Sequence, residues 1–529
     1  MATALGVIFP LFFLGNPSGH DFEFHVNSWM EVLGQWRQGI VYPRWAGLAN
    51  HGYGEARFIF YPPASWVLGA ALGGLLPWKM VPGAYLWLAL TLSGCSMFLL
   101  ARRWLERRDA IFAAALYAAN PYYIVIVYWR SAFAELLAGA LLPLLLLCVL
   151  RLEEEEKKAV VPLGLTVAAA WLTNLPAAVM VNYSLALLIV MVSVLRRSPR
   201  LLLQGALAVL LGAGLAAFFL FPAAYEQKWI AIGQVFGPGV RPQDNFLFTS
   251  IDDPDHNRFN LLVSLIASAE IVVLAIAASR SRRCGRPQRQ AWWRLTIWAS
   301  AAVLLMFSFT SLLWKYLPEL RFTQIPWRWL LCLNVAFALL VTMAWQRWRG
   351  RIVVCLAMLA VLAFVWHRVQ PPWRDNATAI ATMFNNQQSG AGYEGADEYV
   401  PAGGDAYEVK QDAPRVAVEA GSAAKIEMQR WDTESKLFTV DMTQPATLVL
   451  RLFYYPAWRV EVNGRIVDAE AQDDTGQMMI SVLPGKSRVQ LTFKRTWDRT
   501  VGAGISGATF GLLIVVVLFQ QRRQRLLAA

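Results

Sequence analysis

Long apolar runs recur along the chain and are separated by short polar stretches. Most runs have the length of helix, roughly 18–22 residues, that crosses about 30 Å of hydrocarbon. The pattern predicts an all-α polytopic membrane protein with about 12 spans, placed at 2–15, 82–101, 109–127, 134–150, 159–173, 177–195, 201–221, 259–278, 292–311, 327–345, 352–368 and 501–519. A further apolar segment, 64–76, is only about 13 residues long and predicts an interfacial helix rather than a span.

The sequence changes character after the eleventh predicted span. Residues 370–500 contain alternating stretches such as KLFTVDM, ATLVLRLFY and RVQLTF, punctuated by VNGR and LPGKS. Period-two alternation with tight-turn residues is typical of antiparallel strands. We therefore predict a helical membrane domain over 1–369, a small β-sandwich-like domain over 370–500, and a final span with a basic tail over 501–529.

Charge places these regions relative to the membrane. Charged residues make up 16% of the chain, below the quarter that is usual for soluble proteins. Much of the net charge of +12 gathers in five short clusters between predicted spans, at 102–108, 196–200, 279–289, 346–351 and 520–525. This is the positive-inside pattern, so we expect a multi-pass protein of a bacterial inner membrane and no nucleic-acid partner.

The same orientation puts long loops at 16–80 and 222–258, together with the β-rich domain, on the extracytoplasmic side. No cysteine falls in these outward segments, because all five lie in predicted spans or in a cytoplasmic loop: Cys95, Cys148, Cys284, Cys332 and Cys355. A disulfide framework is therefore not expected. The first apolar stretch lacks a basic leader and a cleavage site, which favours a retained span over a signal peptide.

The most polar part of the first outer loop is SGHDFEFHVNSW, residues 18–29. Asp21, His25 and Ser28 fall on one helical face, opposite an apolar face, which predicts an amphipathic helix at the membrane interface. One interpretation is a capping box from Ser18 to Asp21. The other is a functional carboxylate with His20 and His25 beside it, since a zinc site would lack a third ligand at a usual spacing.

The other outer connections also carry charged or polar residues, each with two interpretations. Arg44 and Arg57 either bind phosphate or snorkel from an aromatic belt. Arg130 and Glu135 form either a structural ion pair or a phosphate-binding arginine beside a second functional carboxylate.

Three further connections complete the outer face. Asn174 favours a turn, and Lys228 is a candidate on a loop long enough to be functional. Arg321, Gln324 and Arg328 open the tenth span, where an anionic ligand or interfacial anchoring explains them. The asymmetry between charged outer loops and plain basic inner loops points to an outward site for a lipid-borne anion.

The layout resembles the GT-C superfamily of membrane glycosyltransferases. The resemblance rests on SGHD in a long first outer loop and on YWRSAFAE between the third and fourth spans. The segments YPRW, GYGEARFIFYPP, YWRSAFAE, TNLP and IPWRWL are similar to bacterial membrane proteins named after 6-pyruvoyl-tetrahydropterin synthase. The tail, FYYPAWRVEVNGR followed by VLPGKSRVQLTF, resembles YfhO-like membrane proteins.

That resemblance implies transfer of a sugar from a polyprenyl-phosphate donor to a glycan, lipid or protein acceptor. Asp21 would be the general base, and Glu135 would orient the acceptor or hold a divalent cation. Arginines would stabilise the leaving phosphate, and the implied binding residues are His20, His25, Arg44, Tyr61, Arg130, Asn174, Lys228, Gln324 and Arg328. The DDPDH stretch of the second outer loop is interpreted as a solvated turn, and a requirement for Mg²⁺ or Mn²⁺ stays open, with Asp21 and Glu135 as the ligand candidates.

Two alternatives to this function remain. A lipid or glycan transporter would show charged or broken helices at the membrane midplane and repeated halves. A non-catalytic assembly protein would use the β-rich domain as a binding module.

Overall fold

The computed structural model describes residues 1–154, 159–282, 286–374, 378–419 and 424–528. Cys284 and part of the basic cluster 279–289 lie outside these ranges. The α-helices are α1 (Ala2–Ile8), α2 (Leu11–Leu14), α3 (Phe22–Arg37), α4 (Ala49–Gly52), α5 (Arg57–Phe60), α6 (Pro63–Leu75), α7 (Val81–Ala101), α8 (Arg107–Ala118), α9 (Pro121–Val125), α10 (Phe133–Gly139), α11 (Leu141–Glu153), α12 (Val160–Thr173), α13 (Leu175–Arg196), α14 (Pro199–Leu215), α15 (Ala217–Glu226), α16 (Pro254–Ser281), α17 (Arg286–Leu305), α18 (Ser311–Tyr316), α19 (Leu330–Ala344), α20 (Trp348–Phe364), α21 (Ala379–Ser389) and α22 (Trp497–Ala528).

Short helical turns connect many of these helices. They are η1 (Trp78–Met80), η2 (Ile126–Arg130), η4 (Gln227–Trp229), η5 (Ile232–Phe236), η6 (Pro242–Asp244), η7 (Ser308–Thr310), η8 (Leu320–Thr323), η9 (Pro326–Trp329), η10 (Val365–Val369) and η11 (Asp397–Tyr399).

Among the described residues, eight helices are long and apolar enough to cross a membrane. The pairs α14–α15 and α17–α18 pass the same test together but bend by 75° and 89°, which brings the number to ten at most. The predicted spans 2–15 and 159–173 are short apolar helices instead, so about 12 spans is not confirmed. The first of them is also interrupted at Phe9 and Pro10, where α1 ends and α2 begins. The segment predicted as interfacial forms α6, which is too short to count as a span.

The tail contains the predicted antiparallel strands: β1 (Val416–Val418), β2 (Ala424–Trp431), β3 (Ser435–Met442), β4 (Ala446–Phe453), β5 (Trp458–Val462), β6 (Arg465–Val467), β7 (Glu470–Ala471), β8 (Gln477–Val482) and β9 (Gly485–Phe493). In the described residues they form a four-stranded sheet, β1-β4-β8-β7, and a five-stranded sheet, β2-β3-β9-β5-β6.

Two features explain these strands. Burial alternates along β3 and β9, as the period-two pattern predicts. Asn463 and Gly464 both have positive φ and join β5 to β6 by a tight hairpin turn. Buried residues of both sheets belong to one hydrophobic cluster. The face-to-face stacking of a sandwich stays a prediction, as does the domain boundary at 369/370.

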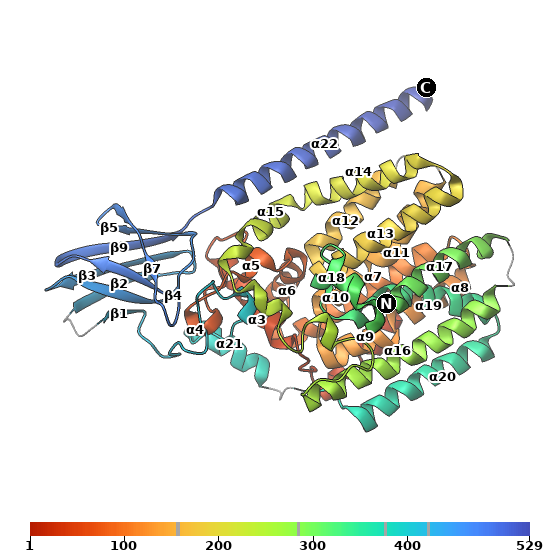
Figure 1. The fold of residues 1–529 in the computed structure, drawn as a ribbon, viewed down its shortest axis with the longest axis horizontal. Helices are drawn as coiled ribbons and strands as arrows, with labels where there is room; N and C mark the ends of the chain where they lie inside the picture. The colour runs from red at the N-terminus through yellow and green to blue at the C-terminus, as the bar shows by residue number, and fades with distance from the viewer. Residues whose placement is uncertain (155–158, 283–285, 375–377, 420–423, 529) are drawn as a thin grey trace.

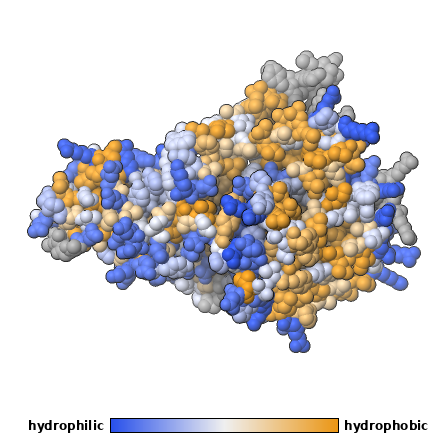
Figure 2. All heavy atoms as spheres, viewed as in Figure 1, coloured by the Kyte–Doolittle hydropathy of each residue, from blue (hydrophilic) through white to orange (hydrophobic). Residues whose placement is uncertain are grey.

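Figure 1 shows the strands gathered at one end of the helical body, with α3, α4, α5 and α21 beside them. Apolar surface covers much of the helical body, whereas hydrophilic surface predominates over the strands (Figure 2). The two parts interlock, because Trp45 and Tyr53 of the first loop belong to the hydrophobic cluster of the sheets. The region between helices and sheets therefore combines the first loop with segments from the far end of the chain.

Candidate functional site

The predicted helix after SGHD begins at Phe22, with Asp21 in the N-cap position and no side-chain cap. The capping box from Ser18 is therefore wrong. The backbone N–H of Asp21 instead donates to the carbonyl of Arg130, at 2.9 Å. Gly19 allows this approach, because a Cβ there would lie 2.5 Å from the Arg130 carbonyl carbon. The motif is thus fixed against the connection between α9 and α10.

The prediction that α3 lies amphipathically on the membrane surface is also wrong. Its polar face is buried as well as its apolar one, since other segments cover it. Arg57 donates to Ser28 Oγ at 2.9 Å, and the Tyr393 hydroxyl donates to Glu31 Oε2 at 2.5 Å. Because Tyr393 belongs to the tail, α3 is a buried scaffold between the first loop and the segment before the sheets.

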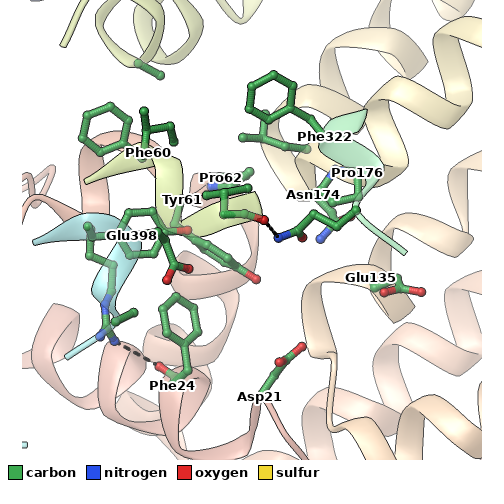
Figure 3. Close-up of a pocket in the computed structure, with 18 of the residues that line it drawn as sticks. Asp21, Phe24, Phe60, Tyr61, Pro62, Glu135, Asn174, Pro176, Phe322 and Glu398 are labelled. Carbon is green, nitrogen blue, oxygen red and sulfur yellow. Dashed lines mark hydrogen bonds between the residues drawn. The ribbon is translucent and has the colours of Figure 1, made fainter. Parts of the chain in front are cut away.

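A cavity of about 800 Å³ lies beside the N-terminus of α3. Its walls come from α3, α5, the start of α10, the turn between α12 and α13, α15, η8 and the tail segment 394–399. In Figure 3 the carboxylates of Asp21, Glu135 and Glu398 point into one space, with Tyr61 between them. The cavity therefore gathers acidic groups from three distant parts of the chain.

Glu135 forms the paired centre of this site. Its Oε2 accepts from Arg130 Nη1 at 2.5 Å and from Arg328 Nε at 3.1 Å, while Oε1 accepts from the Tyr122 hydroxyl at 2.5 Å. Arg328 is held in turn by the Thr323 carbonyl, at 2.8 Å. The carboxylate is 2% exposed and has two guanidinium partners, as a buried charge requires.

Asp21 contrasts with Glu135 because it stays open to the cavity. Its side chain is 39% exposed, and its nearest cation is Arg130, with Nη2 at 3.9 Å from Oδ2. The distance exceeds that of a hydrogen bond, so the carboxylate oxygens keep room for a ligand. Arg130 thus lies between an open and a closed carboxylate.

Most of the sequence-predicted site residues meet at this cavity. Its lining includes His20, Asp21, His25, Tyr61, Glu135, Asn174, Gln324 and Arg328. Arg130 adjoins it through the two carboxylates. Asn174 lies in the connection between α12 and α13 and caps α13 by accepting from the Ala177 N–H at 2.9 Å.

Arg44 and Lys228 are not brought into this cavity. The Arg44 guanidinium lies over the Tyr42 ring, 4.4 Å from its centroid. Lys228 Nζ lies 3.9 Å from the Tyr225 centroid. Aromatic faces therefore account for both cations.

The histidines of the motif are packed among rings. His25 is 2% exposed and contacts the rings of Trp29, Tyr61 and Phe133. Burial lowers the pKa of His25 to about 4 and also lowers the pKa of His20. His25 is therefore a neutral wall of the cavity near neutral pH.

The donor set at this site does not fit a divalent cation. Glu135 is occupied by two guanidinium groups, and the nearest cation to Asp21 is one of them. A divalent cation would be repelled by these guanidinium groups and would compete with hydrogen bonds already made. Within the described ranges there is also no cluster of three His, Cys, Asp or Glu side chains that could hold a metal.

Sequence reasoning missed the acidic wall that the tail contributes. Glu394 and Glu398 line the cavity although they follow the last predicted span of the helical domain. Burial raises the pKa of Glu398 to about 7. Their position depends on Glu55, whose Oε2 accepts from the Ala396 N–H at 2.9 Å. No local pattern around Glu398 indicates that contact.

A fifth acidic residue, Glu270, was missed although its signal is present. It interrupts the apolar run of α16 and is 0% exposed. An acid inside a span is a functional or structural feature by default. Its carboxylate accepts from Asn334 Nδ2 of α19 at 3.2 Å.

Comparison with known proteins gives one family match. The model of a family described as "6-pyruvoyl-tetrahydropterin synthase related domain; membrane protein" matches residues 58–374. No curated protein matches the chain.

Two solved structures show partial similarity. A crystal structure of ArnT from Cupriavidus metallidurans bound to undecaprenyl phosphate has 16% identity and a TM-score of 0.44, covering 68% of this chain and 62% of that one. The apo oligosaccharyltransferase of Archaeoglobus fulgidus has 15% identity and a TM-score of 0.38, covering 75% of this chain and 56% of that one. The chain thus spans about three fifths of each neighbour's length.

Proposed function

The chain belongs to the 6-pyruvoyl-tetrahydropterin synthase related family of membrane proteins, and we propose that it is a glycosyltransferase that takes its sugar from a polyprenyl-phosphate donor. The observation that carries the proposal is the pairing in one cavity of an open carboxylate, Asp21, with two arginines held by Glu135. An open base and a fixed cationic group are the two elements that transfer from a lipid phosphate to a hydroxyl requires.

The shape of the cavity supports a lipid-linked donor. One side is lined by apolar residues of α12, α13 and α15, namely Trp171, Leu175, Val179 and Leu220. These helices belong to the apolar body of the protein, so a prenyl chain would lie against them with its phosphate toward the cavity. The opposite side is polar and comes from α3 and the tail segment.

In the proposed reaction the acceptor hydroxyl is placed beside Asp21. The hydroxyl oxygen forms a bond to the anomeric carbon, and its proton passes to the Asp21 carboxylate. The bond from that carbon to the phosphate oxygen breaks, and the electron pair stays on the departing lipid phosphate. Arg328 stabilises this charge, because its guanidinium lines the cavity and is fixed by Glu135.

Arg130 has a positioning role in this scheme. Its guanidinium pairs with Glu135, and its carbonyl accepts from the Asp21 N–H. It therefore holds the base, Asp21, in a fixed position relative to the groups that bind the phosphate. A single displacement of this kind inverts the anomeric centre. We place the cavity on the extracytoplasmic face of a bacterial inner membrane, because the basic clusters of the sequence lie at the other ends of the helices.

The proposal is tested with purified full-length protein and with its Asp21→Asn variant. Each is incubated with a panel of polyprenyl-phosphate monosaccharides carrying a labelled sugar, together with extracts of cell-envelope glycans, lipids and proteins. The measurements are release of polyprenyl phosphate and transfer of label. General-base catalysis contributes about 10²- to 10⁴-fold, so Asp21→Asn should lower transfer by at least about 100-fold.

A matched control is Asp252→Asn, which changes an exposed carboxylate on the loop before α16. It should transfer at the unaltered rate. Transfer retained by Asp21→Asn would overturn the assignment of the base. Lipid moved across vesicle membranes without release of polyprenyl phosphate would identify a transporter instead.

A further inference from the structure

Three cavities adjoin one another between the helical body and the sheets. The cavity at Asp21 shares Glu23, Asn27 and Glu394 with a second cavity of about 850 Å³. The second shares Ser389, Gly390 and Arg451 with a third, of about 420 Å³. The shared residues place the three cavities in a row from the site to β2 and β3, and we call this row the acceptor groove.

The middle of the acceptor groove is hydrophilic. Exposed amide and hydroxyl side chains line it, including Asn386, Thr382 and Ser389 of α21. Such groups both donate and accept hydrogen bonds, which suits the many hydroxyls of a saccharide. A prenyl chain would cover these amides and hydroxyls without supplying hydrogen-bond partners, so this part of the groove does not suit the donor lipid.

The charge of the groove changes sign along its length. Carboxylates predominate at the Asp21 end, where Glu23 and Glu394 lie at the junction of the first two cavities. At the far end, the third cavity is lined by three arginines, Arg37, Arg415 and Arg451, by Lys436, whose pKa burial lowers to about 7, and by two acids, Glu31 and Asp432. The far end therefore carries an excess of positive charge.

Hydrogen bonds to carbonyl groups, and not ion pairs, hold the cations at the far end among the described residues. Arg451 donates to the carbonyls of His51 and Ala413, and Lys436 donates to those of Asp432 and Thr433. In the part of the chain that the structure describes, no ion pair involves Arg37 or Arg415, both of which are exposed. Exposed guanidinium groups without an ion-pair partner are able to bind carboxylate or phosphate oxygens, whose geometry they match.

A buried acceptor also lies at this end. Gln35 lines the third cavity, and its Oε1 has no hydrogen-bond partner among the described groups. This oxygen is closed to solvent, so Gln35 supplies a polar wall of the cavity and not a contact for a ligand. The ring of Trp431, which lines the same cavity, offers an apolar face of the kind on which a sugar ring packs.

We propose that the acceptor groove binds an anionic saccharide chain, with its reacting end at Asp21 and a carboxylate- or phosphate-bearing unit at Arg37 and Arg415. The role of this chain as acceptor rests on the proposed function, whereas its binding does not. The groove thus narrows the acceptor from glycan, lipid or protein to a charged glycan.

The test measures binding of hexagalacturonate to the full-length protein in detergent. Maltohexaose serves as the neutral probe and hexa-aspartate as the anionic peptide probe. The double variant Arg37→Gln/Arg415→Gln removes both exposed guanidinium groups, and Arg465→Gln on β6 removes an exposed cation outside the groove. We expect Kd for hexagalacturonate to rise about tenfold in the double variant and to stay unchanged in Arg465→Gln. Raising the salt concentration should weaken the binding, because exposed charges are screened.

The outcomes separate this proposal from the proposed function. Hexagalacturonate binding that Asp21→Asn retains and the double variant loses supports the groove, even if no transfer is detected. If maltohexaose bound equally well, the proposed requirement for an anionic ligand would be wrong. If hexa-aspartate bound equally well, the proposed requirement for a saccharide would be wrong. Binding unaffected by the double variant, or no binding, would overturn the groove itself.

Discussion

Two buried glutamates pair with arginine and a tyrosine hydroxyl at different places in the molecule. Glu226 of α15 binds Arg499 of α22 with both oxygens, each at 2.7 Å, and accepts from the Tyr455 hydroxyl at 2.6 Å. Glu135 also accepts from a tyrosine hydroxyl, but two guanidinium groups share its other oxygen. The residue types are the same, and the surroundings differ.

The two pairs differ in whether an exposed carboxylate lies beside them. Glu226 and Arg499 are 0% and 2% exposed, and their bidentate bond joins the helical body to the helix after the sheets. Glu135 lines a cavity, and its partner Arg130 also faces the exposed carboxylate of Asp21. A closed pair therefore serves as an anchor, whereas a pair that borders an open carboxylate is able to act on a ligand.

The largest expected effect is on stability, from Glu226→Gln. This change leaves the buried charge of Arg499 without a counter-ion, which costs about 3–5 kcal/mol. Thermal unfolding in detergent should show the loss, whereas transfer per folded molecule should stay near the original value. Equal losses of activity and stability would mean that this anchor is not separate from the site.

The change Glu135→Gln is expected to lower transfer far more than stability. Arg130 keeps the Asp21 carboxylate as a counter-ion, with Nη2 at 3.9 Å from Oδ2, and Arg328 borders the cavity and keeps the Thr323 carbonyl, so the cost in stability should be smaller than for Glu226→Gln. Without the Glu135 carboxylate, the two guanidinium groups are no longer held in fixed positions relative to each other. Transfer should therefore fall by about 100- to 1,000-fold. Kinetics per folded molecule measure this, and a loss mainly of stability would contradict it.

These contrasts also show how far the sequence reaches. Charged outer loops identified Asp21, Glu135 and Arg328, because burying such residues near a membrane is costly without a role. Arg44 and Lys228 satisfied the same criterion, but aromatic rings account for them, and a sequence does not reveal which ring lies beneath a cation.

The tail shows the second limit. The alternation over 370–500 correctly predicted antiparallel strands, since strand periodicity is local. The return of Glu394 and Glu398 to the cavity depends on contacts of Glu31 and Glu55 with residues more than 300 positions away. No local pattern encodes such contacts, so these two carboxylates of the cavity were missed.

Acidification should lower the stability of the folded protein, because the buried His25 beside the cavity becomes protonated on unfolding. The unfolded chain binds a proton at an ordinary pKa of 6.5, whereas burial lowers the folded pKa to about 4. Stability is therefore complete above about pH 6.5 and falls as pH drops toward 4, by at most about 3 kcal/mol. In His25→Gln the same pH series of unfolding temperatures should be flatter. A constant difference between the two proteins across this range would contradict the role of His25.

The smallest effect is expected at another buried glutamate, Glu270, which sharpens the comparison because it has no cationic partner among the described residues. No ion pair to it occurs in the described residues, and its partner is the Asn334 amide, at 3.2 Å. Glu270 Oε1 and Asn334 Oδ1 are both buried, and neither has a closely spaced hydrogen-bond donor among the described groups. A donor on the Glu270 side would satisfy both, and Gln supplies one permanently with the same shape. Glu270→Gln should therefore change the free energy of unfolding by less than about 1 kcal/mol, whereas Glu270→Ala, which strands the amide, should cost about 1–3 kcal/mol. If Glu270→Gln destabilised the protein as much as Glu226→Gln does, Glu270 would be an ionised anchor like Glu226. A guanidinium partner would then not be what separates charged buried glutamates from neutral ones in this fold.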